Sequence, residues 1–124
     1  MSKVAAITGG AGGIGRAVAE RFAREKQTVV LLDVNGEAGD QVAAGLRKRG
    51  AEIKFLRVDV AQEAEVRTAF DKISAEFGRV DILVNVAGGS VHRHPLDEFP
   101  LGHWQTVIDA NLTSTFLCCR AVTP

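Results

Sequence analysis

Short runs of apolar residues recur along the chain and are separated by longer stretches in which apolar positions follow helical spacing. The runs lie at residues 4–7, 28–32, 53–58 and 82–86 and are rich in β-branched residues. Such composition is typical of strands that a parallel sheet buries on both faces. We therefore predict a buried strand in each run.

The stretches between these runs predict helices. The clearest pattern is an apolar stripe on one helix face, formed by Val66, Phe70, Ile73 and Phe77. Gly50 and Gly78 each precede a strand and can take the left-handed conformation that ends a helix. Strands that alternate with helices imply parallel pairing and right-handed crossovers, so the predicted fold is α/β, a Rossmann-like doubly wound parallel sheet.

A last apolar stripe follows Pro100 and predicts one continuous helix. Its members are Trp104, Val107, Ile108, Leu112, Thr115 and Cys119. Asn111 lies within the stripe, so its amide requires hydrogen-bond partners. Because no further strand follows to cover the one at 82–86, we expect a sheet truncated after the fourth strand and its helix. We also expect the uncovered surface to cause self-association as a homo-oligomer.

Composition narrows the functional classes. With 124 residues, 46% hydrophobic and 24% charged, the chain fits one globular domain, which we place over residues 1–124. Fifteen basic residues balance 15 acidic ones, so no net field attracts nucleic acid or an anionic membrane, and a small-molecule partner is expected. The sequence shows neither a signal peptide nor a membrane-spanning run, so we expect a cytoplasmic protein.

The first strand leads directly into a glycine-rich turn, residues 8–15, in which the next helix begins. Bare backbone lets a pyrophosphate approach, while free N–H groups and the positive end of the helix dipole offset its charge. The glycine spacing fits more than one nucleotide-binding family, but the position between strand and helix favours phosphate binding over a flexible turn. The residues expected to contact the cofactor are Gly9, Gly12, Gly13, Ile14 and Gly15.

Asp33 ends the second strand, where an acidic side chain accepts hydrogen bonds from the adenosine ribose of a dinucleotide. Val34 follows at the same edge and is expected to contact the cofactor too. A carboxylate there repels a 2′-phosphate, and neither the glycine turn nor residues 34–36 supply a Lys or Arg. We therefore expect NAD in preference to NADP. The alternative role for Asp33 is a helix N-cap.

Further candidate cofactor contacts close the third and fourth strands, at the edge where open α/β sheets bind ligands. They are Asp59 and Val60 after the third strand, and Asn85, Ala87 and Gly88 after the fourth. Small residues there leave room for adenine. Helix capping by Asp59 and an ordinary turn at 87–88 are the alternatives.

Together these segments resemble the classical short-chain dehydrogenases/reductases over the whole chain. Residues 8–15 are similar to that family's cofactor motif, 59–60 to its adenine-contacting pair, and 85–88 to its Asn-Asn-Ala-Gly signature. Asn111 resembles the helix asparagine of the catalytic tetrad. Val86 replaces the second asparagine of the signature, at a position where the resemblance implies that the backbone matters more than the side chain.

The resemblance implies hydride transfer between nicotinamide C4 and an alcohol or carbonyl substrate, with Asn111 holding a water in the proton relay. The family's catalytic serine and Tyr-x3-Lys pair have no counterpart, and the sequence contains no tyrosine. We therefore expect weak NAD binding and no turnover by this chain alone. A non-catalytic nucleotide-binding module and a methyltransferase of similar topology are the competing hypotheses.

The histidines and cysteines carry no predicted chemistry. His92 and His94 are spaced by one residue on a loop and lack a third ligand at helical spacing, so with His103 they are interpreted as solvated residues and no metal is expected. By resemblance, the loop at 89–95 borders substrate. The adjacent Cys118 and Cys119 point in different directions on a helix and are interpreted as reduced packing residues.

Overall fold

Strands and helices alternate along the chain in the computed structural model, which describes residues 2–90 and 92–124. The first part comprises β1 (Val4–Thr8), α1 (Gly13–Arg24), β2 (Thr28–Asp33), α2 (Gly36–Lys48), β3 (Ile53–Arg57), α3 (Glu63–Phe77) and β4 (Ile82–Asn85). The second comprises the short 3-10 helix η1 (Leu96–Glu98), α4 (Leu101–Ile108), the π-helical η2 (Asp109–Thr113) and α5 (Ser114–Val122). The prediction of a strand in each apolar run is confirmed, with boundaries that differ by one residue. Burial is confirmed for β1 and β2, whereas β3 and β4 are for the most part only partly buried.

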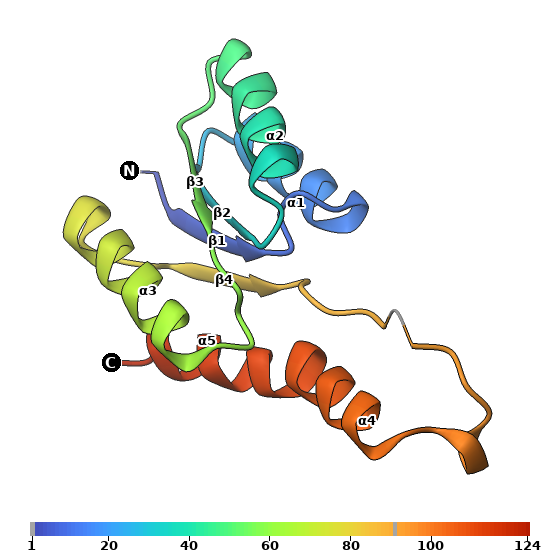
Figure 1. The fold of residues 1–124 in the computed structure, drawn as a ribbon. Coiled ribbons are helices and arrows are strands. Elements are labelled where there is room, and N and C mark those ends of the chain that lie inside the picture. Colours follow the sequence, from blue (N-terminus) through green and yellow to red (C-terminus); the bar gives the residue numbers. More distant parts are fainter. Residues whose placement is uncertain (1, 91) are drawn as a thin grey trace.

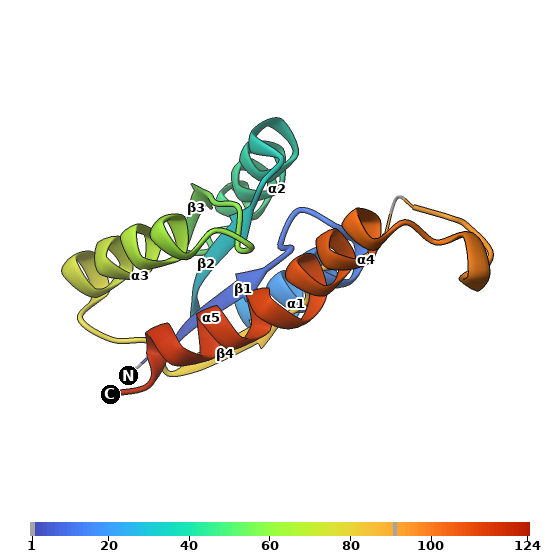
Figure 2. The same ribbon diagram turned by 60° about the horizontal axis from the view of Figure 1, so that its bottom comes forward.

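The strands form one parallel sheet in the order β3-β2-β1-β4. Helices α1 and α2 cover one face, and α3 and α5 cover the other (Figures 1 and 2). The chain moves from β1 outward to β3 and then returns to the opposite side of β1 as β4, so β1 and β4 flank a topological switch point. This arrangement confirms the predicted Rossmann-like α/β fold.

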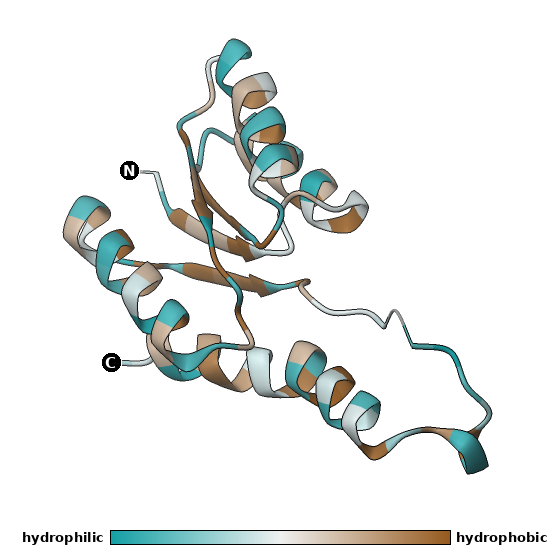
Figure 3. Ribbon diagram, in the orientation of Figure 1, coloured by the Kyte–Doolittle hydropathy of each residue, from teal (hydrophilic) through white to brown (hydrophobic). Residues whose placement is uncertain are grey.

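The core lies on both faces of the two central strands, where the apolar residues concentrate (Figure 3). Val30 and Leu32 of β2 pack toward α3, while Val29 and Leu31 pack toward α1 and α2. Their side chains are fully buried, and each contributes roughly 1.5–3 kcal/mol to stability on burial. The period-2 alternation along one strand thus builds two separate apolar layers.

The predicted features of the surface helices are also found. The α3 stripe is confirmed, because Val66, Phe70 and Ile73 are buried against the sheet. Gly78 ends α3 with a left-handed φ of 75°, and Gly50 follows α2 with a φ of 84°. Both glycines therefore end helices as expected.

The final helix departs from the prediction, because the π-helical η2 divides α4 from α5. Side chains in and beside η2 bond back to the preceding turn: Asn111 Nδ2 donates to the Val107 carbonyl at 2.8 Å, and Ser114 Oγ to the Ala110 carbonyl at 2.8 Å. Such bonds compete with the regular helical ladder. A single π turn inside a helix is frequently found at a functional site.

One edge of the molecule stays uncovered in the part of the chain described. Strand β4 pairs only with β1 and ends the sheet. The adjoining helical stretch exposes large apolar side chains, namely Leu101, Trp104, Leu112 and Phe116. Among the described residues, no helix has the length and hydropathy to cross a bilayer.

Candidate functional site

A cleft of about 550 Å³ opens at the carboxyl ends of the strands, beside the switch point between β1 and β4. It brings together nearly all the cofactor-contacting residues predicted from the sequence: Gly9, Gly12, Gly13, Ile14, Gly15, Asp33, Val34, Asp59, Val60, Ala87 and Gly88. The structure adds Leu32, Val58, Val86 and Ala110 to the lining. Asn85 and Asn111 are not among the lining residues.

At two positions of the glycine turn, Gly9 and Gly15, any side chain would clash with the backbone of the chain itself. Gly9 has a φ of 65°, and a Cβ there would lie 2.8 Å from the backbone nitrogen of Ala87. A Cβ on Gly15 would overlap the Gly9 carbonyl oxygen. Gly13 differs, since a Cβ there would meet no atom within 4 Å. The packing of the described chain therefore does not require glycine at Gly13, which is one of the residues that line the cleft.

Helix α1 directs its N-terminus into this cleft. It begins at Gly13, and its N-cap residue Gly12 has no side chain with which to bond the first N–H groups. Its first turn carries no acidic residue. Free backbone donors and the positive end of the helix dipole are thus available to an anion.

Thr8 holds the ends of β1 and β4 together, a role that the sequence reasoning missed. Its buried hydroxyl oxygen accepts hydrogen bonds from the backbone N–H groups of Val86 and Ala87, both at 3.1 Å. These bonds place the 86–88 segment against the turn at Gly9. They use the backbone of Val86, as expected from the resemblance. The signal in the sequence that could have indicated this role is a hydroxyl residue at the end of an otherwise apolar strand.

Asp33 links the glycine turn to the start of α2. Its Oδ2 accepts from the Ala11 N–H at 3.0 Å, and its Oδ1 accepts from the Asn35 N–H at 2.9 Å. The N-cap of α2 is Asn35, whose side chain accepts from the Ala38 N–H at 3.1 Å. The capping alternative for Asp33 is therefore wrong.

Arg57 lies at the same edge of the sheet as Asp33 and was also missed. It is the register partner of Asp33 across β2 and β3. Its Nε donates to the Val34 carbonyl at 3.1 Å. Residues 34–36, which follow Asp33 along the chain, include no Lys or Arg, whereas parallel pairing brings Arg57 to the same edge from β3.

Asp59 occupies a turn between β3 and α3. Its Oδ1 accepts from the Ala61 N–H at 3.0 Å, and its own N–H donates to Glu65 Oε1 at 3.1 Å. The N-cap of α3 is Gln62, so Asp59 fixes the turn rather than capping the helix. The flanking residues Val58 and Val60 are buried and give the cleft an apolar wall.

The side chains of the two predicted asparagines bond to α5, to α4 and to the loop at Gly89 instead of lining the cleft. Asn85 Nδ2 donates to Cys119 Sγ on α5 at 3.5 Å. Asn111 Oδ1 accepts from the Gly89 N–H at 2.8 Å, while its Nδ2 donates to the Gly89 carbonyl, also at 2.8 Å. With the bond to Val107, the expected need of Asn111 for partners is confirmed.

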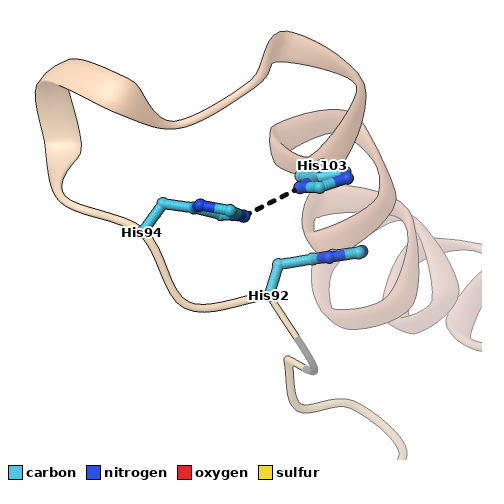
Figure 4. A group of neighbouring side chains, drawn as sticks. All are labelled: His92, His94 and His103. Carbon is cyan, nitrogen blue, oxygen red and sulfur yellow. Dashed lines mark hydrogen bonds between the residues drawn. The ribbon is translucent and has the colours of Figure 1, made fainter.

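Outside the cleft, the histidines gather into a cluster (Figure 4). Loss of surrounding solvent lowers the pKa of His103, and the nearby rings of His92 and His94 lower it further. The cysteines point apart as expected: Cys119 is exposed, whereas Cys118 is buried and burial raises its pKa to about 11. The packing role is thus found for Cys118 alone.

An open parallel sheet with a bare glycine turn at its switch point defines a Rossmann-type nucleotide-binding protein. The family model for short chain dehydrogenase matches residues 3–124, and the chain belongs to this family.

Relatives and solved structures agree with this membership. D-threitol dehydrogenase of Mycolicibacterium smegmatis is 44% identical over 97% of this chain and 46% of its own length. 3beta-Hydroxysteroid dehydrogenase of Mediterraneibacter gnavus is 40% identical over 95% of this chain and 43% of its own length. A crystal structure of NAD+-bound xylitol dehydrogenase superposes with a TM-score of 0.92 at 35% identity, covering 97% of this chain and 46% of that one. The chain thus spans less than half the length of these proteins.

Proposed function

We propose that residues 1–124 form the NAD-binding domain of an oxidoreductase that transfers hydride between nicotinamide and a small-molecule alcohol or carbonyl compound. One observation carries the proposal: the uncapped N-terminus of α1 and the carboxylate of Asp33 border the same cleft. A pyrophosphate needs the first and an adenosine ribose the second. The dehydrogenase relatives and the NAD+-bound xylitol dehydrogenase support this cofactor class.

The cleft offers suitable contact residues for the pyrophosphate and for the adenine of the dinucleotide. The pyrophosphate would lie on the backbone at Gly13 and Ile14, and the adenine between Val60 and Ala87. Ile14 and Val34 are 72% and 57% exposed, so a bound cofactor would cover apolar side chains that now face solvent. This is the expected character of a small-molecule site, apolar walls with a few placed polar groups.

Charge favours NAD over NADP. Asp33 and Asp59 are the charged residues among those that line the cleft. A 2′-phosphate on the ribose would approach the Asp33 carboxylate and be repelled. Arg57 reduces this repulsion but already donates through Nε to the Val34 carbonyl.

The nicotinamide ring supplies the hydride acceptor when the cofactor is bound. The residues of this chain would bind and orient that cofactor, and Asn111 fixes the loop at Gly89. The proton transfer that the family assigns to a tyrosine has no residue here, because the sequence contains none. We therefore propose binding without turnover for the 124-residue chain, which is also what a non-catalytic nucleotide-binding module would show.

Calorimetric titrations with NADH and NADPH, run beside assays of NAD-dependent oxidation of an alcohol panel, test the proposal. We expect saturable NADH binding, weaker NADPH binding and no alcohol oxidation. Tighter binding of NADPH would refute the role of Asp33. Absence of NADH binding at millimolar concentration would refute the cofactor site, and turnover would refute the inactive state of this chain.

A further inference from the structure

All three histidines of the chain meet in one cluster, although they come from separate segments. His92 and His94 lie on the loop that leaves the cleft after Gly89, and His103 lies on α4 (Figure 4). Each offers a ring nitrogen, and these atoms all lie within 4.8 Å of one another. The fold thus supplies the third imidazole, which the spacing along the sequence does not reveal.

The closest pair already has the separation of two ligands on one metal ion. His94 Nε2 and His103 Nδ1 are 3.2 Å apart. Two nitrogens bound at 2.0–2.1 Å in a tetrahedral zinc site are roughly 3.3 Å apart. The hydrogen bond between them requires one N–H and one lone pair. Metal binding therefore needs a change of tautomer that moves the N–H to the other nitrogen of its ring, and a turn of the two rings that directs both lone pairs at the ion.

His92 must turn to join this pair. Its ring stacks on that of His103 with centroids 3.7 Å apart and planes inclined by 12°. Because the lone pair of an imidazole nitrogen lies in the ring plane, stacked rings cannot both direct lone pairs to one ion. His92 is only partly buried and belongs to a loop, so its side chain can turn, and its ring nitrogen already lies within 4.8 Å of the other two.

An aromatic side chain borders the cluster. Phe99 packs edge-on against His94 and His103, with centroids 5.6 Å and 6.4 Å away. This aromatic ring shields the cluster on one side and limits the positions the two rings can take.

We propose that His92, His94 and His103 form a binding site for a borderline divalent cation such as Zn²⁺. Three imidazoles suit zinc, copper and nickel better than magnesium or calcium, which prefer oxygen ligands. A solvent molecule would complete a tetrahedral zinc site. The bound ion would fasten the loop after Gly89 to α4. This site does not depend on the proposed function.

Zinc titration of the untagged 124-residue protein, followed by long-range ¹H–¹⁵N spectra of the imidazole rings, tests the site directly. The chain has only 3 histidines, so every signal reports on the cluster. We expect all the rings to shift together and to saturate at one equivalent of Zn²⁺. Shifts of fewer rings, or shifts that continue past one equivalent, would overturn the proposal.

A variant separates ligation from ring packing. His103→Phe keeps a planar ring for stacking but removes both nitrogens. Since loss of an outer-shell partner alone costs 10–100-fold in affinity, we expect zinc binding to weaken by about 100-fold or more. Cys119→Ser removes the exposed thiol and should bind zinc like the parent. Unchanged zinc affinity in His103→Phe, or a loss in Cys119→Ser, would assign the binding elsewhere.

Limited proteolysis gives a readout that needs no variant. Arg93 is exposed between two of the proposed ligands, and trypsin cleaves after it. One equivalent of Zn²⁺ should slow cleavage at Arg93 while cleavage at the exposed Arg24, on α1, keeps its rate. Equal rates at Arg93 with and without zinc would contradict a metal that fastens this loop.

Discussion

The side chain of Asn111 forms a two-way hydrogen-bonded pair with the backbone of Gly89, accepting from its N–H and donating to its carbonyl, each at 2.8 Å. A side-chain amide is the group that matches both partners at once. Gly88, just before, has a φ of 154°, and a Cβ there would overlap Asn111 Oδ1. The π-helical turn that carries Asn111 thus sets the backbone at the end of the cofactor cleft.

Asn111→Asp tests this link without changing side-chain size. The new oxygen would face the carbonyls of Gly89 and Val107, which accepted hydrogen bonds before. We expect a loss of about 1–3 kcal/mol in the free energy of unfolding, because two carbonyls lose their donor, and weaker NADH binding. Urea unfolding and NADH titration measure the two effects. Gln41→Glu adds the same charge at an exposed site on α2 and serves as control; equal behaviour of both variants would contradict the link.

Gly13 and Gly15 should respond oppositely to alanine. At Gly13 the added methyl meets no protein atom, so Gly13→Ala should fold at least as stably as the parent but obstruct the pyrophosphate. At Gly15 the methyl overlaps the Gly9 carbonyl, so Gly15→Ala should lose about 1–3 kcal/mol of stability. Thermal unfolding and NADH titration of the pair measure both. NADH binding unchanged by Gly13→Ala would show that the phosphate lies elsewhere.

Arg57 should become an NADP-binding residue once Asp33 is removed. In Asp33→Ser the carboxylate no longer repels a 2′-phosphate, and the guanidinium held at the Val34 carbonyl lies at the same edge. We expect NADPH affinity to rise by about tenfold, equivalent to ~1.4 kcal/mol, while NADH affinity falls. The double variant Asp33→Ser/Arg57→Ala should lose the gain. If it keeps the gain, another cation binds the phosphate.

Sequence reasoning located the cleft because its determinants are local. The end of each apolar strand identifies the carboxyl edge of the sheet, and the glycine turn must lie there, so Gly13 and Asp33 could be placed together without a structure. Contacts that depend on register or on the path of a loop could not be read this way. Arg57 lies opposite Asp33 only through parallel pairing, and His103 contacts His94 only because the loop folds back on α4. The π turn at Asn111 was hidden too, since its cause is a set of side-chain bonds to the helix backbone.

Asp81 should make the fold sensitive to acid. Its pKa is lowered first by the hydrogen bond from the Val4 N–H at 2.8 Å and then by Arg79. A lowered folded-state pKa adds stability above the unfolded value, near 3.8, and this stability is lost as pH falls through the folded value. Asp81→Asn should therefore be less stable than the parent at neutral pH, with the difference shrinking in acid. Urea unfolding at several pH values checks this, and a constant difference would contradict it.

The uncovered edge at β4 should cause self-association of this chain. An edge strand and exposed apolar residues on the adjoining helices together favour pairing with a second copy. Leu112 is 65% exposed in the middle of that surface, so Leu112→Lys should shift the protein toward monomer. Leu96→Lys makes the same change at a residue that is 90% exposed on η1, outside that helical stretch, and should leave association unaltered. Light scattering over a wide concentration range measures the effect. A parent protein that stays monomeric throughout, or an equal response of the two variants, would show that this surface is not the interface.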